Sequence, residues 1–156
     1  MAQVSNVFIA VERRKAMKPV EQALAVTDRG FLGCIHGRVG SKRQVLLVDI
    51  ETLREFGLLP GTIRENITTA GLNLAELRPG QRLGMGEAIL EVTVPCQPCS
   101  RMDEIRMGLQ KELENRRGIL CRVIEGGRIS RGDAIEIVDA SLMPRMEERV
   151  EQERRN

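Results

Sequence analysis

Apolar and polar residues alternate along several short segments of the chain, and this pattern predicts β-strands. The clearest case is residues 80–95, GQRLGMGEAILEVTVP, where apolar residues at 90, 92 and 94 alternate with Glu91 and Thr93. Successive side chains of a strand point to opposite faces, so this alternation gives one apolar and one polar face. Glycines earlier in the segment mark a bend. We therefore predict a hairpin over residues 80–95.

Four other segments have the length and the apolar content of strands. They are residues 4–12, 44–49, 119–125 and 134–139, and the second is a continuous apolar run typical of a buried strand. The connector between the last two, GGRISRGD, is rich in residues that favour turns, so we expect turns there. The Arg-Gly-Asp within it is interpreted as turn chemistry and not as a cell-adhesion signal.

Residues 50–57, IETLREFG, differ from these segments because their apolar residues recur at helical spacing. Gly57 follows the last of them, where a glycine commonly ends a helix. We expect one short helix here. No internal repeat or low-complexity linker divides the 156 residues, a length typical of one domain.

The expected architecture is a single, mostly β domain over residues 1–140, a barrel or sandwich with a few short helices. Residues 141–156 form a charged C-terminal tail. Its positive and negative charges recur at helical spacing with little apolar face, which predicts a solvated helix.

Composition narrows the classes of partner. The chain has 24 Lys and Arg against 22 Asp and Glu, three Phe and no Trp or Tyr. A formal charge of +2 and so few rings on which bases could stack argue against nucleic-acid binding. The first residues lack the pattern of a signal peptide, and no segment reaches the length of a membrane span. We expect a cytoplasmic protein with no membrane partner, whose cysteines are reduced, metal-binding or reactive.

Residues 95–101, PCQPCSR, carry the candidate chemistry. Prolines beside both cysteines should end the preceding strand, which places Cys96 and Cys99 on an exposed corner before a helix-like segment over 100–108. A helix start and the nearby Arg101 both favour the thiolate form of Cys99. The alternative is that both cysteines are small buried apolar residues. Cys121 alternates with apolar neighbours inside a strand and is assigned to the core.

Three mechanisms use two cysteines at this spacing. A thiol–disulfide redox pair normally opens a helix in a βαβ setting, which this pattern lacks. A structural zinc ion would need Cys34, His36, Cys96 and Cys99 together and would make the protein a non-catalytic interaction module. A single thiolate in a positively charged pocket would bind a soft transition metal or carry a sulfur atom.

Three stretches of the chain resemble successive signatures of the MOSC domain, named for the C-terminal part of molybdenum-cofactor sulfurases. They are GFLGCIHGRVGSKRQVLLVD, LLPGTIRENITTAGLNLAELRPGQRLGMG, and VPCQPCSRMD continuing to NRRGILCRVIEGGRISRGDAIEIV. The resemblance covers about residues 20–139 and implies a β-barrel-like fold. It also implies a key cysteine, matching Cys99, that either ligates molybdenum in a reductase of N-hydroxylated compounds or carries persulfide sulfur. Cys34 stands where many relatives have Asp.

The resemblance further implies partners for this chain. They are the molybdenum cofactor or a sulfur-donor protein, with pyridoxal phosphate entering only through that donor. A pyranopterin carries a phosphate and a ring edge rich in donors and acceptors, which arginine, amide and carboxylate side chains recognise. Surface ion pairs for the arginines and a structural role for the histidine are the alternatives. The residues expected at the cofactor are His36, Arg43, Arg64, Glu65, Asn66, Cys96 and Arg101.

Overall fold

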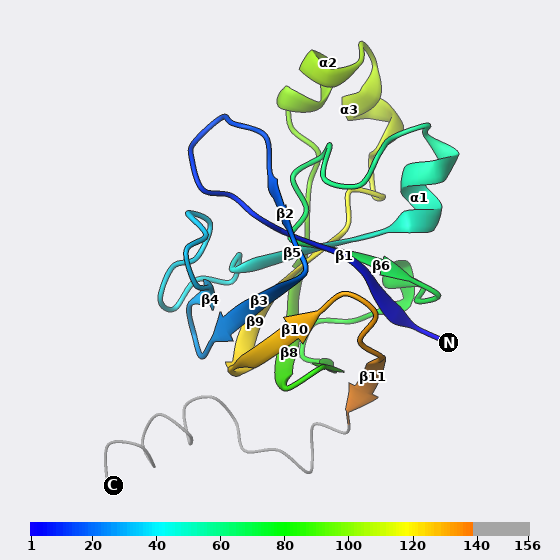
Figure 1. Ribbon diagram of the computed structural model, residues 1–156. Helices are drawn as coiled ribbons and strands as arrows, with labels where there is room; N and C mark the ends of the chain where they lie inside the picture. The colour runs from blue at the N-terminus through cyan, green and yellow to red at the C-terminus, as the bar shows by residue number, and fades with distance from the viewer. Residues whose placement is uncertain (139–156) are drawn as a thin grey trace, which may run out of the picture.

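Strands dominate the computed structural model, which describes residues 1–138 (Figure 1). The strands are β1 (Gln3–Ile9), β2 (Lys18–Val20), β3 (Gln22–Val26), β4 (Gly30–Phe31), β5 (Val45–Asp49), β6 (Ile67–Ala70), β7 (Arg82–Met85), β8 (Ala88–Pro95), β9 (Ile119–Glu125), β10 (Gly127–Ser130) and β11 (Ile135–Val138). The helical segments are α1 (Ile50–Glu55), the 3-10 helix η1 (Leu74–Glu76), α2 (Arg101–Ile105) and α3 (Leu109–Glu112). The charged tail that we predicted to be helical lies outside the described residues.

Two sheets make up the fold. The larger has eight strands in the order β11-β7-β8-β9-β5-β6-β1-β2, and the smaller has the order β10-β3-β4. The ladders do not close completely, but the start of β1 meets the chain just before β11. Gln3 forms a bridge with Ala134, and the Val4 N–H donates to the Asp133 carbonyl at 2.8 Å. This contact curls the large sheet, so the predicted mostly β, barrel-like fold with short helices is confirmed.

The central strand β5 is buried on both faces, as its continuous apolar run predicts. Val45 and Leu47 belong to the apolar core inside the barrel. Leu46 and Val48 belong to a second core beneath the helices. The following helix α1 begins at Ile50 and is capped by Asp49, whose carboxylate accepts the Thr52 N–H at 3.1 Å. The second core matters for function because residues of the candidate site belong to it.

The predicted hairpin over residues 80–95 is present as β7 and β8. Met85 lies opposite Ala88, so Gly86 and Glu87 form the turn. β9 matches the predicted strand 119–125, and β8 pairs with it in antiparallel fashion. The strands predicted over 4–12, 44–49 and 134–139 are also present with slightly different ends, as β1, β5 and β11.

The prediction of turns throughout residues 126–133 is wrong for the first half of this connector, and only the second half consists of turns. Its first half forms β10, which pairs with β3 and buries Ile129 completely. A side chain at Gly127 would come within 2.6 Å of the Glu87 carbonyl, so this glycine permits close packing. The Arg-Gly-Asp part does form a turn, with the Asp133 carboxylate accepting the Ser130 N–H at 2.7 Å.

Helices are few and short. The helix predicted over 50–57 is confirmed as α1, with Gly57 in a left-handed conformation just after its end. The helical segment expected over 100–108 is shorter than predicted and forms α2, with α3 beside it at one end of the molecule (Figure 1). No helix among residues 1–138 is long and apolar enough to cross a membrane.

Candidate functional site

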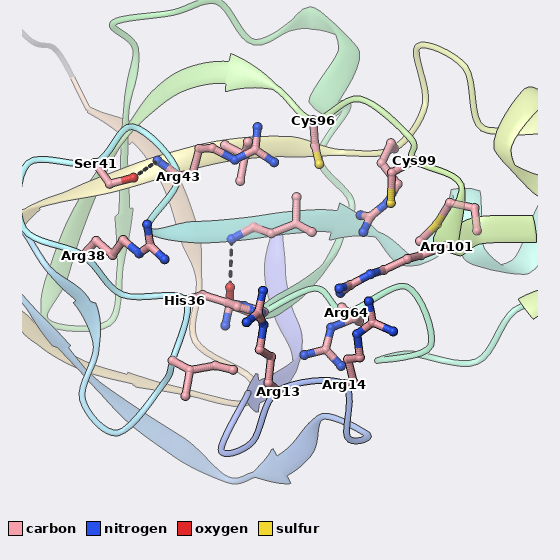
Figure 2. A pocket seen from close by; sticks show the side chains of 16 residues that line it. Arg13, Arg14, His36, Arg38, Ser41, Arg43, Arg64, Cys96, Cys99 and Arg101 are labelled. Carbon is pink, nitrogen blue, oxygen red and sulfur yellow. Dashed lines mark hydrogen bonds between the residues drawn. The ribbon is translucent and has the colours of Figure 1, made fainter. Parts of the chain in front are cut away.

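A cavity of about 670 Å³ opens between four loops that follow or precede strands of the large sheet (Figure 2). The β1–β2 loop, the β4–β5 loop, the α1–β6 loop and the segment from β8 to α2 all contribute to its wall. Basic side chains predominate, and no Asp or Glu of residues 1–138 lines it. The basic residues are Arg13, Arg14, His36, Arg38, Arg43, Arg64, Arg101 and Arg117.

No arginine of this cavity forms an ion pair with another residue of the described part of the chain. Ion pairs there use Arg82, Arg106, Arg116 and Arg131, none of which lines the cavity. The surface ion pairs considered for Arg43 and Arg64 are therefore not formed between described residues. A concave site with several guanidinium groups outside any ion pair attracts anions, and arginine forks suit phosphate and carboxylate.

Arg117 is the most unusual of these residues because its side chain is buried. The residue is 6% exposed, and its Nη2 donates to the Ile63 carbonyl. Its Nε and Nη1 atoms are buried and have no hydrogen-bond partner in residues 1–138. Burial lowers the pKa of this guanidinium, and the nearby Cys96 and Glu65 oppose that effect. Two buried nitrogen atoms without a hydrogen-bond partner are costly, so Arg117 marks a place for an anion at the cavity wall.

Cys99 lies in the wall of the same cavity and is exposed. It precedes α2, and its carbonyl accepts the Met102 N–H at 2.9 Å. Arg101, at the start of α2, also lines the cavity (Figure 2). The predicted exposed corner at a strand-to-helix junction is confirmed for Cys99. A thiol there faces both solvent and the basic wall.

Cys96 lines the cavity but is only 6% exposed, so the prediction of an exposed corner is wrong for it. The reason is that β-type pairing continues one residue beyond Pro95. The Cys96 N–H donates to the Gly118 carbonyl at 2.9 Å, which holds the residue against the sheet. Its side chain packs in the second core together with Met102. The interpretation as a small buried apolar residue therefore fits Cys96 and does not fit Cys99.

Glu65 and Asn66 have different positions. Glu65 is fully buried, does not line the cavity, and accepts hydrogen bonds from the Gly61 N–H at 3.0 Å and the Thr68 hydroxyl at 2.9 Å. Burial raises the pKa of its carboxyl group. This carboxylate holds the turn that precedes Arg64.

Asn66 lines the cavity, yet its amide is used by the protein. Its Oδ1 accepts the Leu46 N–H at 3.0 Å, and its Nδ2 donates to the Phe8 carbonyl at 3.3 Å. Nδ2 also donates to the sulfur of Cys34 at 3.4 Å. Asn66 thus ties three segments together behind the cavity.

Cys34 is buried behind the cavity and does not line it. Its sulfur accepts hydrogen bonds from Asn66 and from the Ala10 N–H, each at 3.4 Å. Burial raises the pKa of the thiol, but hydrogen bonds with His36 and Ala10 and the charge of His36 outweigh this. The pKa is lowered from 9.0 to about 7.

The four residues considered for structural zinc are not brought together. No group of three or more His, Cys, Asp or Glu residues able to hold a metal ion occurs among residues 1–138. His36, Cys96 and Cys99 line the cavity, whereas Cys34 is held behind it. Because a structural zinc site needs four converging ligands, the zinc-module alternative is overturned.

Sequence reasoning found most of this wall and missed part of it. His36, Arg43, Arg64, Asn66, Cys96, Cys99 and Arg101 do line one cavity, and Glu65 lies behind it. Arg13, Arg14, Arg38 and Arg117 line the cavity but were not among the residues expected at the cofactor. The run ERRK between two strands was an available signal for the first two. No local signal distinguishes Arg117 from Arg116.

The fold and the site together define a barrel-like β domain with a basic cavity that presents an exposed cysteine. The family model of the MOSC domain matches residues 21–136. The chain therefore belongs to the MOSC domain family. A comparison with curated protein sequences gives no match.

Solved structures share the fold. The YuaD protein of Bacillus subtilis superposes with a TM-score of 0.74 at 21% identity, over 87% of this chain and 94% of that one. YiiM of Geobacillus stearothermophilus gives a TM-score of 0.72 at 19% identity, over 89% and 76% of the two chains. YiiM of Escherichia coli gives 0.65 at 21% identity, over 88% and 70%. At these identities the likeness concerns the fold.

Proposed function

We propose that this protein binds the molybdenum cofactor in the basic cavity and that the Cys99 thiolate is the protein's ligand to the metal. The observation that carries the proposal is that an exposed cysteine and seven arginines line one cavity, whereas no Asp or Glu of residues 1–138 lines it. Thiolates are preferred ligands of soft metal centres, and arginines recognise phosphate. Membership of the MOSC domain family supports the same assignment.

The residues present fit such a group. The cofactor is anionic, and the cavity supplies guanidinium groups that form no ion pair with described residues. On Arg117, two buried nitrogen atoms have no hydrogen-bond partner in residues 1–138. Arg43 and Arg64 would bind the phosphate, Arg117 would bind an anionic group deeper in the wall, and Cys99 would hold the metal. When bound, the cofactor would supply two-electron redox chemistry, for which reduction of N-hydroxylated compounds is the proposed use.

A second function uses the same thiol. Cys99 is exposed at the cavity wall, where a partner protein has access to it, and this observation favours a role as a sulfur carrier. The Cys99 thiolate would attack the outer sulfur of a cysteine persulfide on the donor protein; the donor's S–S bond breaks, its cysteine leaves as a thiolate, and Cys99 holds the persulfide. Arg101 and Arg117 would then bind the negative terminal sulfur. All four cysteines are free, which suits the reducing cytoplasm proposed as the location.

Elemental analysis of the purified protein tests these functions. The parent protein should contain molybdenum that depends on Cys99, so Cys99→Ser should lose it while Cys121→Ala should retain it. For the sulfur carrier, mass spectrometry without reductant should show one added sulfur atom on Cys99 and no molybdenum. A protein that holds neither molybdenum nor added sulfur, after expression in cells that make the cofactor, would contradict both functions.

A further inference from the structure

A second cavity, of about 620 Å³, lies against the first. Arg14, Arg64, Arg101 and Met102 line both cavities. Figure 2 shows the three arginines near one another at one side of the first cavity, from the β1–β2 loop, the α1–β6 loop and α2. These arginines therefore form a shared basic wall between two spaces, each within the roughly 300–1,000 Å³ typical of ligand sites.

The second cavity has a distinct apolar part in its lining. Phe8, Met17 and Met102 are 6%, 7% and 2% exposed and form its buried apolar lining. Leu59 and Ile105 line it as well and are 76% and 39% exposed. A ligand would remove exposed apolar area of Leu59 and Ile105 from water, whereas the three buried residues form a floor that is already shielded.

Positive charge surrounds this apolar lining. Lys15 joins the three shared arginines, whereas Glu104 is the only carboxylate of residues 1–138 that lines the cavity. Burial lowers the pKa of the Arg64 guanidinium, and the positive charge of Arg101 lowers it further. A negative group placed between these two guanidinium groups would relieve their repulsion.

The wall is held in position before any ligand binds. Arg64 has a left-handed backbone with φ of 68°, and its Nη1 donates to the Lys15 carbonyl at 2.5 Å. The buried carboxylate of Glu65 fixes the preceding turn through the Gly61 N–H. A side chain at Gly61 would come within 2.9 Å of the Phe8 ring, so the glycine lets the turn lie directly on the apolar floor. Such preorganisation lowers the entropic cost of binding.

We propose that the second cavity binds a small organic anion, with an apolar, ring-sized body on Phe8, Met17 and Ile105 and its acidic group on Arg64 and Arg101. The inference stands on the two cavities and does not require a metal cofactor. Cys99 lines the first cavity only, but Arg101 and Met102 line both, so we assign the second cavity as the compartment for a substrate of chemistry at Cys99. That last assignment rests on the proposed function.

The probe for this site is anilinonaphthalene sulfonate, which joins an apolar ring system to one anionic group. The chain contains no Trp or Tyr, so the emission of the bound dye is free of strong protein fluorescence. Phenylnaphthylamine, nearly the same ring skeleton without the sulfonate, is the matched neutral probe. The folded parent protein should bind the sulfonate at one saturable site. The neutral probe should bind roughly ten- to hundredfold more weakly, because it makes no charge-assisted hydrogen bonds.

Two substitutions near α2 locate the site. Ile105→Glu places a carboxylate in the cavity and should weaken binding of the sulfonate roughly tenfold or more through like-charge repulsion. Met107→Glu adds the same charge two residues later, at a position that is 92% exposed and does not line the cavity, and should leave binding unchanged. Circular dichroism checks that both variants are folded. Equal effects of the two variants, or equal affinity for the two probes, would overturn the inference.

Arg43→Ala separates this inference from the proposed function, because Arg43 lines the first cavity only. The variant should bind the cofactor more weakly and retain the dye. If Ile105→Glu weakens dye binding and Met107→Glu does not, the result supports the second site even in a protein that never holds molybdenum. Dye binding that is lost in Arg43→Ala and intact in Ile105→Glu would assign the dye to the first cavity and overturn the second site.

Discussion

Arg116 and Arg117 are consecutive in the chain but lie in opposite environments. The Arg116 guanidinium forms a double hydrogen bond with the Glu55 carboxylate at 2.9 and 2.5 Å, and its side chain is 41% exposed. It also lies 5.1 Å from the centre of the Phe56 ring. Arg117 is 6% exposed, lines the basic cavity and has two nitrogen atoms without a partner in residues 1–138.

This pair gives a matched test of the anion site. Arg117→Met should weaken binding of inorganic phosphate, measured by calorimetry, by about 1.5 to 3 kcal/mol, the range for hydrogen bonds to charged groups. Arg116→Met should leave the affinity unchanged and should cost at most about 1 kcal/mol of stability, because it removes an exposed ion pair. Arg117→Met also removes the hydrogen bond to the Ile63 carbonyl and the attraction to the buried Glu65, so it should lower the free energy of unfolding by about 1 to 3 kcal/mol, and phosphate is titrated where the variant is folded. Equal phosphate affinities of the two variants would contradict a role for Arg117 in anion binding.

Arg43 and Arg64 should contribute to the binding of the cofactor itself. Replacing either by Ala should weaken cofactor binding by about 1.5 to 3 kcal/mol. The free energy of unfolding should change little for Arg43, whose side chain has no hydrogen-bond or ion-pair partner in residues 1–138. Titration of the apo-protein with purified cofactor gives the affinity, and chemical denaturation gives the stability. Unchanged affinity in both variants would show that these arginines are solvated surface residues with no role in cofactor binding.

Cys99 should be the most readily alkylated thiol. It is exposed, whereas Cys34, Cys96 and Cys121 are buried. Burial also raises the pKa of Cys121, which keeps it in the unreactive thiol form. Under native conditions at neutral pH, mass spectrometry after brief treatment with iodoacetamide should show modification at Cys99 first. Modification of Cys121 at an equal or faster rate would count against the site.

The buried Cys34 predicts a dependence of stability on pH. Its pKa is about 7 in the folded protein against 9.0 for the unperturbed thiol, so the folded state loses this proton at lower pH than the unfolded chain. The free energy of unfolding should therefore rise between pH 7 and 9, by about 2 to 3 kcal/mol, and this gain is lost as pH falls through 7.

Denaturation by urea at a series of pH values measures this effect. Cys34→Ser should remove the rise between neutral and alkaline pH. Cys121→Ala is the control, because the raised pKa of Cys121 keeps it uncharged throughout that range, and it should lower stability equally at all pH values. The same slope in the parent protein and in Cys34→Ser would show that Cys34 does not ionise as described.

Local patterns were sufficient for much of the fold. The alternation of β8, the apolar run of β5 and the helical spacing of α1 all predicted the observed elements, because each depends on neighbours a few residues away. The same reasoning placed Cys99 at the junction of a strand and a helix. It failed for β10, where pairing with β3, about a hundred residues earlier, overrides the turn-forming residues.

The sequence by itself determined which residue types the site would have: an exposed cysteine, a histidine on a glycine-rich loop, and arginines near the starts of strands. Only the tertiary structure decided which of them share a cavity. Four loops bring the arginines together, the continued pairing of β8 with β9 buries Cys96, and the position just before β9 buries Arg117 while its neighbour reaches Glu55. Burial and electrostatic environment depend on contacts between distant segments, and no local pattern encodes them.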